Sequence, residues 1–151
     1  MSSNHEFLVL AFADHSPTDY LNFINYPHAT HVHDDLVHYI DDALQWIPTL
    51  NPATNEPGSG LNLLGVTAIL SEGAAVASGI FQCWAQLFRR GPEELTLSGH
   101  WTWVAGQPRS RHYEVLRYRR DDVVATFERL ARDCNQVATS NATLFVLHLG
   151  I

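Results

Sequence analysis

The feature that most constrains the fold is a segment with strand periodicity between two stretches with helical periodicity. Residues 72–90 and residues 123–138 carry apolar side chains at helical spacing. Between them, residues 95–104 and 112–119 alternate as strands do, and the turn-forming residues 105–110 join them. Two strands joined this closely form an antiparallel hairpin, so a regular alternation of strands and helices is excluded.

Three further segments give regular signals. The apolar run at residues 6–13 predicts a largely buried strand, and residues 143–150 predict a further strand. A helical stripe that begins at Asp34 predicts a helix that Pro48 ends, and the acidic Asp34 and Asp35 suit the positive end of its dipole.

The middle of the chain gives weaker signals. Residues 49–60 are rich in proline, asparagine and glycine, which predicts a long surface loop. Residues 61–69 form either a strand or an extended lead into the next helix, with the hydroxyl of Ser71 as a candidate helix cap.

Together these elements predict the order β-α-(β)-α-β-β-α-β. We expect an α+β fold in which about three helices pack on one side of a mixed or mainly antiparallel sheet. With 151 residues, of which 46% are hydrophobic and 17% charged, the chain has the size and composition of one globular domain spanning residues 1–151.

The charge balance narrows the classes of partner. Sixteen acidic residues face nine basic ones, all arginine, and the net charge is −7. This balance disfavours nucleic acids and anionic membranes and suits a more basic protein partner. Because no apolar run approaches the ~20 residues of a membrane span and no signal-peptide pattern is present, we expect a cytoplasmic protein.

A cluster of histidines is the strongest candidate for catalytic chemistry. Imidazole is a good zinc ligand, but the spacing of the cluster matches no standard zinc site. We therefore interpret the cluster as a polar loop and helix start and expect no cofactor, with a small metal-dependent enzyme as the alternative. The candidate metal ligands are His28, His31, His33 and His38.

The other chemical candidates have structural interpretations. The acidic pairs at 93–94 and 121–122 fit solvated element ends, and His148 in its apolar strand fits a hydrogen-bonded core histidine. Cys83 and Cys134 both fall in helices, which favours free thiols with a packing role. No catalytic residue is therefore assigned.

Trp101 and Trp103 lie at strand spacing, and the alternation of residues 95–104 puts them on one face with Leu95 and Leu97. This pattern favours a role in the core over a ligand platform. If the two tryptophans were exposed, they would instead serve as anchors of an interface.

Several short motifs together resemble a family of small bacterial immunity proteins associated with polymorphic or contact-delivered toxins. The similarity extends from about residue 59 to the end of the chain. The motifs are SGLNL at residues 59–63, GPEEL at 91–95, the strand at 98–103, Tyr113 with Glu114, and FVLHLGI at 145–151. The resemblance implies a protein that binds a cognate toxin and occludes its active site.

Under this hypothesis, acidic and aromatic side chains are the expected contacts, because complementary charge speeds encounter with a basic toxin. A structural subunit that forms a homodimer or larger homo-oligomer through the tryptophan face is a third alternative. The expected partner-binding residues are Asp34, Asp35, Asp41, Asp42, Glu56, Trp101 and Trp103.

Overall fold

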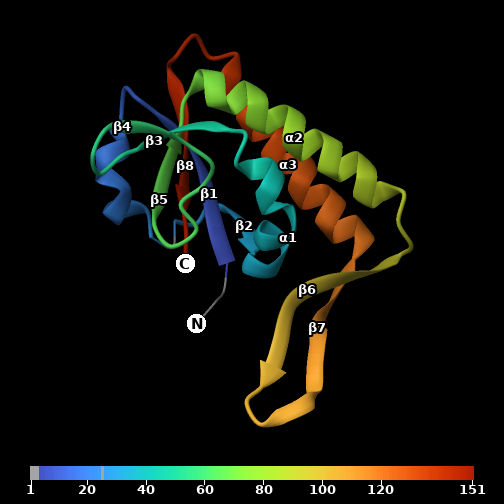
Figure 1. Ribbon diagram of the computed structural model, residues 1–151. Helices are drawn as coiled ribbons and strands as arrows, with labels where there is room; N and C mark the ends of the chain where they lie inside the picture. Colours follow the sequence, from blue (N-terminus) through green and yellow to red (C-terminus); the bar gives the residue numbers. More distant parts are fainter. Residues whose placement is uncertain (1–3, 25) are drawn as a thin grey trace.

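The computed structural model describes residues 4–24 and 26–151, which form a six-stranded sheet, a separate two-stranded sheet, three α-helices and one 3-10 helix (Figure 1). The order of the large sheet is β2-β1-β8-β5-β3-β4, and every pair of neighbouring strands in the described part of the chain is antiparallel. The predicted α+β class is confirmed. The strands are β1 (Asn4–Ala11), β2 (Thr30–His33), β3 (Pro48–Asn51), β4 (Glu56–Ser59), β5 (Val66–Ile69), β6 (Glu94–Val104), β7 (Gln107–Arg119) and β8 (Leu144–Leu149), and the helices are η1 (Pro17–Phe23), α1 (Asp34–Leu44), α2 (Ser71–Arg89) and α3 (Arg120–Ala138).

The central strand β8 is buried on both faces of the large sheet. Val146 belongs to the core that the three α-helices cover, whereas Phe145 and Leu147 belong to a smaller core that includes Phe23 of η1. A strand buried on both faces has no polar alternation, which explains the continuous apolar run of this segment. The α-helices cover one face as expected, but η1 covers part of the other.

The main core lies between the sheet and the pair formed by α2 and α3, which run side by side (Figure 1). Phe81 and Phe88 of α2 pack against Phe127 of α3 with ring centroids 6.0 and 5.6 Å apart. Burial of such large side chains contributes roughly 1.5–3 kcal/mol each. These helices therefore account for much of the apolar stabilisation.

Several details of the prediction are wrong. The expected loop at residues 49–60 is the hairpin β3–β4, in which Asn55 adopts a positive φ of 60°. Its proline and glycine content fits β4, a solvent-exposed strand at the edge of the sheet. Pro57 has no amide hydrogen to donate, and on an edge strand this removes no hydrogen bond from the interior of the sheet. The predicted polar loop before Asp34 also contains β2, which pairs with β1.

The helix ends also differ from expectation. Ser71 is the first residue of α2 and does not cap it, because its hydroxyl donates to the carbonyl of Val137 on α3. The helix that Pro48 was expected to end already stops at Leu44. None of the helices in the described residues combines the length and apolarity that crossing a membrane requires.

Candidate functional site: an aromatic hairpin arm

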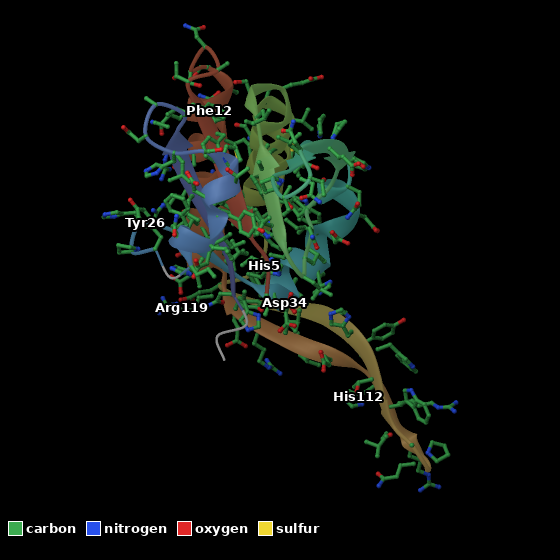
Figure 2. The ribbon with its side chains drawn as sticks, turned by 90° about the vertical axis from the view of Figure 1, so that its left-hand side faces the viewer. His5, Phe12, Tyr26, Asp34, His112 and Arg119 are labelled. Atoms are coloured by element: carbon green, nitrogen blue, oxygen red, sulfur yellow. The ribbon has the colours of Figure 1, made fainter. Side chains whose placement is uncertain are left out.

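The hairpin β6–β7 is fixed to the body at its root and then projects away from it (Figures 1 and 2). Leu95 and Leu116 are buried at the root. Leu95 belongs to the main core, and Tyr118 packs against that core. The amide of Arg120 donates to the carbonyl of Glu93, which closes the root at the start of α3. We call residues 98–115, beyond this anchored root, the arm.

A β-bulge separates the root from the arm. Ser98 pairs with Val115 and Trp101 pairs with Tyr113, so three steps on β6 correspond to two on β7. Gly99 lies in the bulge, and a side chain there would press against Leu116 and Glu114. The extra residue reverses which face of β6 each later side chain occupies.

The bulge corrects the prediction for Trp101 and Trp103. Trp101 lies on the face opposite Leu95 and Leu97, because it shares a face with its cross-strand partner Tyr113. Trp101 is 54% exposed and Trp103 is 57% exposed, so neither is a core residue. The change of face comes from the bulge, which the spacing of apolar residues does not reveal.

The exposed face of the arm is apolar and aromatic. The Trp101 and Tyr113 rings make an edge contact with centroids 4.8 Å apart, and Tyr113 and Val115 are 58% and 60% exposed. Contiguous exposed apolar groups are unusual on a monomer surface and mark interaction sites. Aromatic side chains are also the residues that most often dominate binding energy in interfaces.

The arm differs in charge from the rest of the molecule. It carries Arg109 and Arg111 against the single acidic residue Glu114, whereas the whole chain has a net charge of −7. At its tip, Gly106 has a φ of 80°, and the Ser110 hydroxyl lies 2.7 Å from the amide of Val104. These local contacts shape the end of the arm without burying its side chains.

The predicted histidine cluster is dispersed. His31 lies 3.8 Å from Glu6, and His33 caps α1 by accepting from the amide of Asp35 at 3.2 Å. The ring of His28 packs against Tyr26, and His38 is a surface residue of α1. Within residues 4–24 and 26–151, no group of three or more histidine, cysteine, aspartate or glutamate side chains is placed to hold a metal ion.

A chain of four side chains, His38, Asp34, His5 and His148, connects α1 to the core. Asp34 Oδ1 lies 3.4 Å from His38 Nε2 and 2.9 Å from Nε2 of His5, which is fully buried (Figure 2). His5 Nδ1 in turn lies 2.8 Å from Nε2 of buried His148. Burial and the neighbouring charge of His5 lower the pKa of His148 to about 3, so this ring is neutral at physiological pH.

The core histidine was predicted, but its partner was not. His148 makes only one of its two side-chain hydrogen bonds, because its Nδ1 atom has no partner in the described structure. His5 precedes the apolar run of β1 and His148 lies within that of β8, and nothing else in the sequence points to the pair. The antiparallel pairing of β1 with β8 brings the two histidines together.

The tyrosine at the arm's root contacts the same end of α1. Tyr118 Oη lies 3.3 Å from His33 Nδ1, and burial together with Asp35 and Asp34 raises the pKa of Tyr118 to about 12. The phenol therefore stays protonated at physiological pH and can donate a hydrogen bond. Asp34 and Asp35 thus lie in the first turn of α1 and also act on Tyr118 at the root of the arm.

The other predicted contact residues lie outside the arm, on α1 and β4. Asp41 accepts from the side chain of Gln45, Asp42 is exposed on α1, and Glu56 is exposed on β4.

Both cysteines are free thiols. Cys83 is exposed on α2, which contradicts its predicted packing role, whereas Cys134 is buried. Burial raises the pKa of Cys134 to about 12.

Comparison with known proteins adds no relative: no family model, no curated protein and no solved structure matches this chain. The site is therefore interpreted from its own geometry.

Proposed function

We propose that the protein is a cytoplasmic, non-catalytic immunity-type protein that neutralises a cognate bacterial toxin. It forms a stoichiometric complex, and the aromatic face of the arm is its principal contact with the toxin. The observation that carries the proposal is the exposed apolar surface on a projecting hairpin. Trp101, Trp103 and Tyr113 form its aromatic part.

The shape of the arm supports a role in binding. A two-stranded ribbon exposed to water has little core of its own, so its apolar side chains gain most from burial against a partner. A projecting element can also enter a concave surface, which suits occlusion of an active site. The root holds the ribbon on α1 and α3 through Tyr118 and Arg120.

The family resemblance supplies the class of partner. Its motifs include residues 98–103 together with Tyr113 and Glu114, which are all arm residues. The net charge of −7 would speed encounter with a more basic toxin, and exposed Asp42 and Glu56 would contribute to that field. Asp34 and Asp35 are proposed to orient the arm's root.

The test uses the toxic domain encoded by the gene adjacent to this one as the probe. The two chains are co-expressed in bacteria, growth is measured, and the purified complex is weighed by light scattering. We expect protection and a 1:1 complex. The double variant Trp101→Ala/Trp103→Ala should weaken binding by roughly 1000-fold and abolish protection, because two anchors at about 2 kcal/mol each are lost.

Leu64→Ala is the matched control, since Leu64 is an exposed apolar residue outside the arm. It should protect as well as the wild-type chain. Undiminished protection by the double tryptophan variant would refute the arm as the contact. The absence of any complex at micromolar concentration would refute the toxin assignment.

A further inference from the structure

A second apolar surface follows the outward side of α2. Ala74, Ala77, Phe81, Ala85 and Phe88 face the core, and the opposite side of the helix is exposed. Side chains three and four residues apart share a helix face, so the exposed residues form one continuous row. We call this row the α2 stripe; it comprises Glu72, Val76, Gly79, Cys83, Leu87 and Arg90.

The middle of the α2 stripe borders a groove of about 460 Å³ between α2 and the end of α1. Val76, Gly79 and Cys83 line it from α2, and Trp46 lines it from the residues that follow α1. Trp46 is 71% exposed, and Leu87 farther along α2 is also exposed. The groove is therefore an apolar surface that no described part of the chain covers.

Gly79 has no role in packing the body of the protein. A Cβ atom built at this position meets no atom within 4 Å. Glycine in a helix interior costs about 1 kcal/mol relative to alanine. By contrast, Gly73 in the same helix is required, because a side chain there would collide with the carbonyl of Pro48. At Gly79 only an approach from outside would benefit from the missing side chain.

The two ends of the α2 stripe carry opposite charges. Glu72 lies at the amino end of α2 and Arg90 caps its carboxyl end. Within residues 4–24 and 26–151, neither forms an ion pair. A surface that is acidic at one end and basic at the other is complementary to its own antiparallel copy.

We propose that two copies of this chain pair through an antiparallel contact of their α2 stripes. A two-fold axis between Gly79 and Cys83 would place Gly79 of one copy opposite Cys83 of the other. The same register places Glu72 opposite Arg90 at both ends, and the small central residues let the helices approach closely. This interface does not involve the arm, so it goes beyond the proposed toxin complex and does not depend on it.

Sedimentation equilibrium of the purified full chain tests the proposal. The wild-type chain should form a dimer at micromolar concentration. Glu72→Arg and Arg90→Glu should each raise the dimer Kd about tenfold, since each puts two pairs of like charges in contact. The double variant Glu72→Arg/Arg90→Glu restores both pairs and should return the Kd to near the wild-type value.

Gly79→Gln should give a monomer, because its side chain would separate the two helices. Circular dichroism checks that this variant is folded, which we expect since glutamine favours a helix more than glycine does. The control is Gln82→Ala, at an exposed α2 position outside the groove, and it should dimerise normally. A wild-type monomer at all concentrations would overturn the proposal, and so would a dimer insensitive to Gly79→Gln and to the charge changes.

Gly79→Cys provides a second measurement that does not depend on the strength of association. Mild oxidation should join it to Cys83 of the second copy and give a reducible dimer. Cys83→Ala in the same background should remove that product. Failure to cross-link a chain that sediments as a dimer would place its interface elsewhere.

Discussion

Nε2 of His148 lies 2.8 Å from Nδ1 of His5, and neither ring is exposed to solvent. Nε2 of His5 donates a hydrogen bond to Oδ1 of Asp34 at 2.9 Å, so Asp34 holds one end of the histidine pair. The Nδ1 atom of His148 has no hydrogen-bond partner among the described residues. Protonation of His148 would therefore place a charge inside the core without a hydrogen-bond partner at Nδ1.

The first prediction concerns stability below neutral pH. The pKa of His148 falls from 6.5 in the unfolded chain to about 3 in the folded chain, so only the unfolded chain takes up this proton between those values. The contribution of His148 to stability is therefore fully present above pH 6.5 and is lost as the pH falls toward 3. The slope is at most about 1.4 kcal/mol per pH unit.

Urea unfolding at pH 7.5, 6 and 5 measures that slope. His148→Gln keeps a side chain that can hydrogen-bond to His5 but does not titrate, so its free energy of unfolding should fall less steeply with acid than that of the wild-type chain. Parallel slopes for the two proteins would contradict the assignment.

The second prediction separates the two faces of the hairpin at neighbouring positions. Leu116→Ala removes a buried side chain at the root and should destabilise the fold by about 2–4 kcal/mol. Val115→Ala changes an exposed side chain and should cost less than about 0.5 kcal/mol. Denaturant unfolding of both variants provides the comparison, and equal costs would mean that β7 does not bury one face at the root and expose the other as described.

The third prediction uses the two thiols. Cys83 is exposed, whereas Cys134 is buried and burial raises the pKa of its thiol to about 12. A thiol reagent should therefore modify one cysteine rapidly in the native protein and the second only after unfolding. Peptide mapping identifies which one reacts. Fast labelling of Cys134 in the native state would show that α3 does not protect it.

The fourth prediction compares two glycines of α2. Gly73→Ala should destabilise the fold by at least about 1 kcal/mol, because the methyl group would collide with the carbonyl of Pro48. Gly79→Ala should stabilise the folded monomer by about 0.5–1 kcal/mol, since the position is open and alanine favours helix. Thermal unfolding at low protein concentration, where dimers are dissociated, measures both signs.

The sequence pattern was sufficient wherever an element has a clear apolar signal. The apolar stripes predicted α2 and α3, the alternation predicted the two strands of the hairpin, and the continuous apolar run predicted β8, which is buried on both faces. The hairpin β3–β4 was not predicted, because exposed edge strands rich in proline and glycine have the composition of loops. Ser71 was misassigned because its hydroxyl has a distant partner on α3.

The candidate site was less predictable than the fold. One additional residue on β6, near Gly99, moves Trp101 from the core face to the exposed face. The local sequence pattern does not predict this bulge. The link between His5 and His148 joins residues 143 positions apart, so only the pairing of β1 with β8 creates it. The resemblance to immunity proteins provided the class of partner, which remains a proposal.

The strand order also has a consequence for how the chain folds during its synthesis. β8 lies between β1 and β5, so residues 4–11 and 66–69 leave the ribosome long before the strand that pairs with both of them. Until residues 144–149 emerge, each of these early strands has an open hydrogen-bonding edge toward the missing neighbour. The nascent chain therefore keeps these two unpaired edges until β8 emerges, and a holdase chaperone would have its greatest effect on yield during that interval.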